Sequence, residues 1–167
     1  MMNGVKLIWM TDEMYHSFFR EYENDPDLCM PGQDYVRYEY CEERVERYIQ
    51  RQHESKRVAL AILYNDEIAG EIIFRNIEDH QFATMGIVLK NTKYKDRGIG
   101  TAAEKLAVRF AFYEMDIPVL FADTIQANTR SQHVLEKAGF TFIREDKDFR
   151  YYRIDRASDP ARLTEEY

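Results

Sequence analysis

The stretch YKDRGIGT at residues 94–101 follows the apolar run MGIVL at 85–89 and opens a long amphipathic segment. Two glycines separated by one residue, Gly98 and Gly100, let a backbone approach a ligand closely at the start of a helix. The first N–H groups of a helix have no partner inside it, and the helix dipole favours negative charge there. The stretch therefore predicts an anion site, such as a phosphate cradle. Because glycine pairs are also common at ordinary turns, the rest of the chain has to decide between the two interpretations.

The residues before this stretch predict one strand, two helices and three more strands. In chain order, the predicted elements are a strand at 5–10, helices at 11–22 and 41–53, and strands at 57–64, 68–75 and 82–90. Asp, Pro and Gly residues between positions 24 and 32 separate the two helices by a long loop. Only short turns separate the last three strands, so these strands are expected to be antiparallel to one another.

The residues after this stretch predict two further helices and three further strands. They are a helix at 98–115, a strand at 119–124, a helix from Asn128 to Gly139, and strands at 141–144 and 149–154. The strands that flank the long helix are expected to be parallel, through a right-handed crossover. The chain thus predicts an α/β (α+β) fold in the order βααβββαβαββ, with a central mixed, mostly antiparallel sheet flanked by helices. Residues 1–156 form one domain in this interpretation, and residues 157–167 form a loose tail.

The helix predicted at 98–115 carries an apolar stripe with helical spacing. The members of the stripe are Ala103, Leu106, Ala107, Phe110 and Ala111. On this pattern Glu104, Lys105 and Arg109 lie outside the stripe. The helix is therefore expected to bury Leu106 and to expose Glu104.

Composition limits the class of protein. The chain has 167 residues, 45% of them hydrophobic, which excludes a disordered chain and suits one domain. Its net charge of −7 argues against a nucleic-acid partner and suits a cationic one. Its two cysteines, Cys29 and Cys41, have no nearby histidine pattern, which argues against a disulfide scaffold or a metal site. No apolar run is long enough for a signal peptide or a membrane span, so we expect a cytoplasmic protein without a membrane partner.

Two motifs, in this order and at this separation, carry a resemblance to a known family. The first is a strand and a loop followed by Q/R-x-x-G-x-G/A at a helix start, here KDRGIG at 95–100. The second is an N-x-x-S helix that ends in G-F, here NTRSQHVLEKAGF at 128–140. The chain resembles the GNAT superfamily of acyl-CoA-dependent N-acyltransferases over nearly its whole length. Within the superfamily it is most similar to the ribosomal-protein N-terminal, antibiotic and polyamine acetyltransferases. The resemblance implies the GNAT fold, acetyl-CoA as co-substrate and no metal.

The resemblance also implies where acetyl-CoA binds. Its pyrophosphate sits on backbone N–H groups of residues 95–101, with added charge from Lys93, Lys95 or Arg97. Asp96 must then point away from the phosphates. The preceding strand splays from its parallel neighbour, so its end pairs with the pantetheine arm and offers an N–H to the thioester carbonyl. The implied cofactor-binding residues are Val88, Leu89, Lys90, Lys95, Asp96, Arg97, Gly98, Ile99, Gly100, Thr101 and Asn128.

The second motif holds the candidates for the catalytic acid. Asn128 caps the helix that follows it and, by the resemblance, also contacts the cofactor. Ser131 either bonds back to an earlier carbonyl or, as the resemblance implies, donates a proton to the departing CoA thiolate. Many relatives carry a tyrosine acid seven residues after the asparagine, where this chain has Leu135. No tyrosine at that position can therefore act as the acid in this chain.

A general base is needed because an amine must lose a proton to attack a thioester. Asp123 occupies a place where the ribosomal-protein alanine acetyltransferases carry a catalytic glutamate. It is either a desolvated base or a hydrogen-bonded carboxylate at the end of a strand. Glu71 and His80 are weaker candidates, because each could face solvent.

The acyl acceptor is the least determined part of the prediction. In the family, acceptor specificity resides in the regions that correspond here to 25–43 and 145–152. The first region provides either an aromatic, acidic wall for an ammonium group or a solvated loop with a few packed tyrosines. The residues concerned are Tyr35, Tyr38, Glu39, Tyr40, Glu42 and Glu43.

The sequence therefore predicts an acetyl-CoA-dependent N-acetyltransferase. Acetyl passes to a primary amine by direct attack in a ternary complex, because no well-placed cysteine nucleophile is evident. The amine belongs to a small molecule or to a protein N-terminus, and a homodimer would be common for the family. The alternative is a non-catalytic acyl-CoA-binding or sensing module, because the motifs specify cofactor binding better than they specify an acid or a base.

Overall fold

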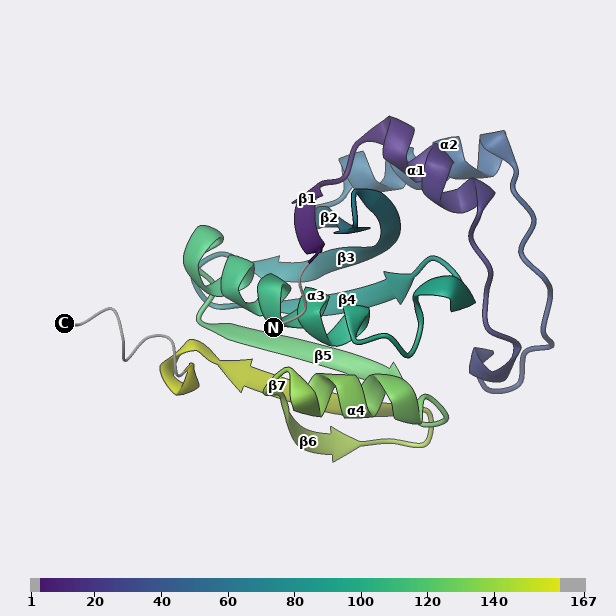
Figure 1. Cartoon of the computed structure of the whole chain (residues 1–167). Helices are drawn as coiled ribbons and strands as arrows, with labels where there is room; N and C mark the ends of the chain where they lie inside the picture. Colours follow the sequence, from purple (N-terminus) through teal and green to yellow (C-terminus); the bar gives the residue numbers. More distant parts are fainter. Residues whose placement is uncertain (1–3, 160–167) are drawn as a thin grey trace.

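One seven-stranded sheet in the order β1-β2-β3-β4-β5-β7-β6 organises the protein (Figure 1). This computed structural model describes residues 4–159. Its strands are β1 (Val5–Trp9), β2 (Val58–Tyr64), β3 (Glu67–Glu78), β4 (Phe82–Leu89), β5 (Val119–Ile125), β6 (Thr141–Glu145) and β7 (Phe149–Asp155). Its helices are α1 (Asp12–Arg20), α2 (Glu42–Glu54), α3 (Ile99–Arg109) and α4 (Thr129–Lys137), and a π-helical segment, Phe110–Glu114, continues α3. The predicted order βααβββαβαββ and the mixed, mostly antiparallel sheet are confirmed.

The predicted boundaries differ from the structure mainly at three places. The first helix ends at Arg20 rather than at residue 22. β3 runs on to Glu78, because an irregularity in its pairing with β4 lets the strand continue past Arg75. A short 3-10 turn, Arg156–Ser158, crosses the predicted boundary between the domain (1–156) and the tail (157–167), and residues 160–167 lie outside the described part of the chain. Within residues 4–159, no helix is long and apolar enough to cross a membrane.

The helices cover both faces of the sheet. Side chains alternate between the faces along a strand. On β2, Leu60 belongs to the core that includes α3 and α4 residues, whereas Ala59 packs with Tyr15 of α1 and Val45 of α2. One face is therefore covered by α3 and α4, and the other by α1 and α2. The α1–α2 connection (residues 21–41) lies beside the C-terminal end of β4 (Figure 1).

β4 and β5 separate partway along their length. Their parallel pairing begins with Phe82 and Val119, ends with Met85 and Ala122, and goes no further although both strands continue. Beyond this point β5 stays paired with β7, while β4 keeps only β3 as a neighbour. The predicted splay is confirmed, and it leaves one edge of β4 open at residues 86–89.

Hydrogen bonding determines which backbone groups face this opening. The N–H of Lys90 donates to the carbonyl of Ala69, with an N···O distance of 2.7 Å. Bonded residues alternate along an antiparallel pair, so Val88 also directs its N–H toward β3. The N–H groups of Ile87 and Leu89 point into the opening instead. Within the predicted stretch 88–90, Leu89 is thus the residue whose N–H can meet a thioester carbonyl.

The face that α3 buries differs from the apolar stripe that the sequence predicts. Leu106 is 39% exposed, whereas Glu104 is 0% exposed. The buried residues of the helix are Ile99, Ala103, Glu104, Ala107 and Val108. The prediction that Glu104 lies outside is wrong, because α3 packs against the sheet and α4 together and so buries more than one stripe.

Candidate active site

Two cavities meet where β4 and β5 separate. The first, of about 630 Å³, lies between the α1–α2 connection, the end of β4 and the N-terminal parts of α3 and α4. The second, of about 340 Å³, lies between β3, β4, β5 and α4. The residues that line both cavities, together called the junction below, are Ile87, Val88, Glu104, Asn128 and Ser131. Ligands in the two cavities would meet at the junction.

The N-terminal end of α3 provides the predicted anion cradle beside the first cavity. Gly98 precedes the helix with a φ of 75° and a ψ of 0°, a left-handed backbone that glycine adopts without strain. The N–H groups of the first turn, which starts at Ile99, have no acceptor within the helix. Gly100 lines the first cavity, and a β-carbon there would lie 3.8 Å from Val134 and 3.9 Å from Leu89. N–H groups without an acceptor in the helix therefore lie next to the wall of the first cavity at this place.

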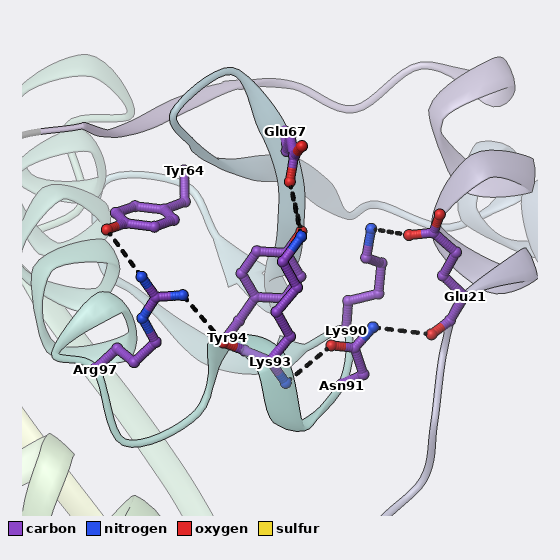
Figure 2. Close-up of polar contacts among 8 residues, drawn as sticks. All are labelled: Glu21, Tyr64, Glu67, Lys90, Asn91, Lys93, Tyr94 and Arg97. Atoms are coloured by element: carbon purple, nitrogen blue, oxygen red, sulfur yellow. Dashed lines mark hydrogen bonds and ion pairs between the residues drawn. The ribbon is translucent and has the colours of Figure 1, made fainter.

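Two of the predicted phosphate-binding cations are engaged elsewhere. Lys93 Nζ lies 3.1 Å from Glu67 Oε2, and the Tyr94 hydroxyl donates to the same oxygen at 3.1 Å (Figure 2). These contacts hold the pKa of Glu67 below its usual value. Arg97 donates to the Tyr64 hydroxyl at 3.3 Å and lies over the Tyr64 ring (Figure 2). Lys93 and Arg97 thus stabilise the loop before α3 through these contacts.

The cations that line the first cavity are Lys95 and Arg130. Lys95 Nζ lies 3.4 Å from Asp25 Oδ2, which links the loop before α3 to the α1–α2 connection. Arg130 Nε lies 3.0 Å from Asp96 Oδ1, so Asp96 is directed toward the start of α4. The negative charge of Asp96 beside the cradle is therefore paired with Arg130, which the sequence motifs do not identify as a site residue.

The α1–α2 connection is fastened to the end of β4. The buried Lys90 pairs with Glu21, and Asn91 Nδ2 donates to the Glu21 carbonyl at 3.1 Å (Figure 2). The N–H of Glu23 donates to the Lys90 carbonyl at 2.9 Å. Lys90 therefore orders the wall of the first cavity, and its backbone groups are not available to a cofactor.

Two polar residues of α4 belong to the junction. Asn128 Oδ1 accepts a hydrogen bond from the Ser131 N–H at 3.0 Å, so Asn128 is an N-cap as predicted and also lines both cavities. Within residues 4–159, Ser131 Oγ makes no hydrogen bond to an earlier carbonyl. Ser131 is partly buried, and its hydroxyl can meet a ligand at the junction.

Glu71 is a buried carboxyl on the wall of the second cavity. It is 3% exposed and accepts hydrogen bonds from the hydroxyls of Tyr15, at 2.6 Å, and Tyr48, at 3.3 Å. Burial raises its pKa to about 7, although both tyrosine hydrogen bonds act in the opposite direction. Its register partner on β4 is Val88, a junction residue, so Glu71 lies one strand away from the open edge of β4 and lines the second cavity with Val88. The solvent-facing alternative is excluded for Glu71, because α1 and α2 cover it.

Asp123 lines the same cavity but is held in an ion pair. Its Oδ2 lies 2.7 Å from Arg75 Nη2, and both side chains are 29% exposed. The pair engages one of the two carboxylate oxygens of Asp123 with a cation, whereas no cation pairs with Glu71, so we take Glu71 as the better candidate for the base. His80 is exposed, pairs with Asp116 at 2.8 Å and lines neither cavity.

Glu104 is a second buried carboxyl, and it differs from Glu71 in having no partner. Among residues 4–159, neither of its oxygens finds a hydrogen-bond partner. Burial alone raises its pKa to about 8. A buried carboxyl without a partner is costly, and few proteins retain one without a use for it.

Replacement of Glu104 with glutamine is expected to remove a pH-dependent loss of stability. The folded pKa lies above the unfolded value of 4.5, so the wild-type protein loses stability as the pH rises from about 4.5 to about 8. The variant cannot ionise and should gain a few kcal/mol relative to wild type across that range. Thermal unfolding at pH 5 and pH 8 measures the difference, with the exposed neighbour change Lys105→Gln as the control. An equal difference at both pH values would contradict a neutral Glu104.

The α1–α2 connection contributes acidic groups and packed tyrosines. Acidic residues that line the first cavity from this connection are Glu23, Asp25 and Asp34. Tyr38 packs against Tyr22 with ring centroids 5.1 Å apart, and Tyr40 Oη lies 2.9 Å from His16 Nδ1. Neither tyrosine lines the first or the second cavity, but both line a third cavity of about 550 Å³, together with Tyr35 and acidic residues of the α1–α2 connection. The ring contacts suit the packed-loop alternative, and the aromatic, acidic wall stays a prediction. The remaining residues of the predicted wall are exposed and line none of these three cavities: Glu39, Glu42 and Glu43.

The predicted cofactor-binding residues fall into two groups, according to whether they line one of the first two cavities. Those on a wall of the first or second cavity are Val88, Leu89, Lys95, Gly100 and Asn128. Those on neither wall are Lys90, Asp96, Arg97, Gly98, Ile99 and Thr101. Backbone donors in the second group can still reach the cradle, because the first turn of α3 directs its N–H groups out of the helix end.

The chain is similar to known acetyltransferases in sequence and in fold. The Acetyltransferase (GNAT) domain family matches residues 5–141. The N-acetyltransferase PseH of Campylobacter jejuni is similar in structure, with a TM-score of 0.69 and 19% identity over 92% of this chain and 99% of that chain. Its complex with acetyl coenzyme A gives a TM-score of 0.61 and 23% identity over 68% of this chain and 79% of that chain. The dodecameric spermidine N-acetyltransferase of Vibrio cholerae gives a TM-score of 0.70 and 13% identity over 96% of this chain and 99% of that chain. No curated protein matches the sequence significantly.

Proposed function

The chain belongs to the GNAT acetyltransferase family and is an acetyl-CoA-dependent N-acetyltransferase, and from this we propose that it acetylates a primary amine by direct attack in a ternary complex. The observation that carries the proposal is the buried carboxyl of Glu71 on the wall of the second cavity, across β4 from its open edge. A thioester at that edge would have a backbone donor on one side and a base within the adjoining cavity. This arrangement needs no covalent enzyme intermediate.

Acetyl-CoA occupies the first cavity in this proposal. Its pyrophosphate lies on the first-turn N–H groups of α3, with Lys95 and Arg130 in reach from the cavity wall. Its pantetheine arm pairs with the open edge of β4, as an added strand would. The Leu89 N–H then polarises the thioester carbonyl, and the acetyl carbon reaches the junction.

The acceptor amine occupies the second cavity. The free amine attacks the thioester from that cavity, and Glu71 accepts the proton that the nitrogen loses. A cavity of about 340 Å³ suits a small molecule or the narrow end of a longer chain. We therefore favour a small-molecule primary amine over a protein N-terminus as the acceptor.

Two-substrate kinetics test the direct attack. When acetyl-CoA and amine are both varied, a ternary complex gives intersecting double-reciprocal lines. Parallel lines, with stoichiometric acetylation of the enzyme when amine is left out, would contradict the proposal. Cys29 is the nucleophile to check, because it lines the first cavity. A Cys29→Ser variant is expected to keep the intersecting pattern and the wild-type kcat.

Ser131 is proposed to meet the departing sulfur. Its hydroxyl lies at the junction and makes no hydrogen bond to another side chain or carbonyl within residues 4–159. The Ser131→Ala change is therefore expected to lower kcat about tenfold and to leave the Kd for acetyl-CoA within about twofold of wild type. Steady-state kinetics and calorimetric titration measure the two quantities. An unchanged kcat would make Ser131 a structural residue.

A further inference from the structure

We propose that Glu104 is the acid that supplies a proton to the departing CoA sulfur. The inference rests on the proposed function, because it assumes that acetyl-CoA and amine meet at the junction. It concerns a residue of α3, whereas the side chain of the base, Glu71 on β3, points to the other face of the sheet, which α1 and α2 cover.

The first step is the composition of the junction. Of its members Ile87, Val88, Asn128, Ser131 and Glu104, only the last two carry a proton on oxygen. A serine hydroxyl is a far weaker acid than a thiol, so it can hydrogen-bond to sulfur or pass a proton on, but it is not a net proton source. Glu104 is the junction's one carboxyl among the described residues.

The second step is direction. Side chains of a helix lean toward its N-terminus, and Glu104 stands one turn after Gly100. The carboxyl therefore leans toward the cradle and the opening of β4, where the pantetheine arm would lie. Its own surroundings supply no competing partner, since both oxygens are unbonded within the described residues.

The third step is the protonation state. Burial keeps Glu104 neutral at neutral pH, and only the neutral form can donate. No charged group is a cause of this shift. Besides Glu104, the charged and titratable residues on the walls of the two cavities are Tyr22, Glu23, Asp25, Cys29, Asp34, Arg57, Glu71, Arg75, Lys95, Asp123 and Arg130. They hold the ion pairs and hydrogen bonds described above or line the cavities at a distance that leaves Glu104 unpaired.

The step balances as follows. The amine nitrogen bonds to the thioester carbon, and Glu71 accepts a proton from that nitrogen. The C–S bond then breaks, and its electron pair stays on sulfur. The Glu104 O–H proton passes to sulfur and gives the CoA thiol and a Glu104 carboxylate. The carboxylate regains a proton from solvent, and Glu71 returns its proton to solvent, before the next turnover.

The test uses Glu104→Gln, Glu104→Leu and the control Lys105→Gln in the full chain. The glutamine can hydrogen-bond but cannot donate a proton, and the leucine can do neither. Both variants are expected to lose about 10- to 100-fold in kcat, with the Kd for acetyl-CoA within about twofold of wild type. The wild-type rate should also fall as the pH rises above about 8, and the glutamine variant should lack this decline. The control should match wild type.

Four outcomes would overturn the proposal. A wild-type kcat in the glutamine variant would show that no proton leaves Glu104. A loss in the leucine variant alone, accompanied by weaker acetyl-CoA binding, would assign Glu104 to cofactor binding. A wild-type protein that turns over no amine would overturn the proposed function itself, whereas wild-type turnover with an active glutamine variant overturns only the role of Glu104. If neither variant folds, the high-pH decline of the wild-type rate still decides, because its absence contradicts the proposal.

Discussion

Replacement of Glu71 with glutamine is expected to lower kcat about 100-fold or more and to leave acetyl-CoA binding within about twofold of wild type. The glutamine keeps the size of the side chain and can still hydrogen-bond to Tyr15 and Tyr48. It cannot accept a proton from the amine. Initial rates and calorimetric titration of acetyl-CoA give the two quantities. Glu78→Gln, an exposed change at the far end of the same strand, is the matched control.

The pH dependence of the rate distinguishes Glu71 from Asp123. Burial places the pKa of Glu71 at about 7, so the wild-type kcat should rise with pH through that value as the carboxyl loses its proton. The glutamine variant should lack this rise. A parallel Asp123→Asn variant should keep it, although loss of the ion pair with Arg75 would lower stability. An active Glu71→Gln variant beside an inactive Asp123→Asn variant would transfer the role of base to Asp123.

The Gly98→Val change is expected to weaken acetyl-CoA binding at least about tenfold. Gly98 has a φ of 75°, and a β-branched residue is strained in that conformation by about 1–2 kcal/mol or more. Relief of the strain would turn the first N–H groups of α3 away from the pyrophosphate, and the added methyl groups would enter the approach to the cradle.

A matched variant separates this effect from general destabilisation. Gly139 also has a positive φ, 103°, but lies at the C-terminal end of α4 and lines neither cavity. Gly139→Ala should lower the unfolding temperature and leave the Kd for acetyl-CoA unchanged. Unchanged affinity in Gly98→Val would place the phosphate site elsewhere. Equal weakening in both variants would trace the loss to stability.

Features of the fold that depend on local signals could be predicted from the sequence. Turn residues between apolar runs gave the hairpins, and Asn128 and Gly139 marked the ends of α4 correctly. The splay of β4 from β5 followed from the family resemblance rather than from any local pattern. Its consequence for the N–H of Leu89 needed the register with β3.

The chemistry of the site depended on burial, which local patterns do not determine. Glu71 stands inside the apolar run IAGEIIF at 68–74, and an acid in such a run was the available signal for a buried carboxyl. Its importance became visible only when α1 and α2 were seen to cover it. Glu104 was predicted to be exposed because Leu106 was counted in the buried stripe of α3. In the structure Leu106 is exposed and Glu104 is buried. The contacts of Lys95 and Asp96 involve partners far away in the chain, Asp25 and Arg130, which no spacing rule connects.

The most direct test of the central claim is amine-dependent release of CoA thiol from acetyl-CoA. Purified protein is incubated with acetyl-CoA and a panel of small primary amines, polyamines, amino acids and aminoglycosides, with N-terminal peptides as a further arm. Thiol release and the mass of the product are followed together, with the Glu71→Gln variant in parallel. We predict that at least one small amine is converted to its N-acetyl product with one thiol released per product, and that the variant is nearly inactive. Tight acetyl-CoA binding without turnover of any amine would contradict the claim and leave a non-catalytic acyl-CoA-binding protein.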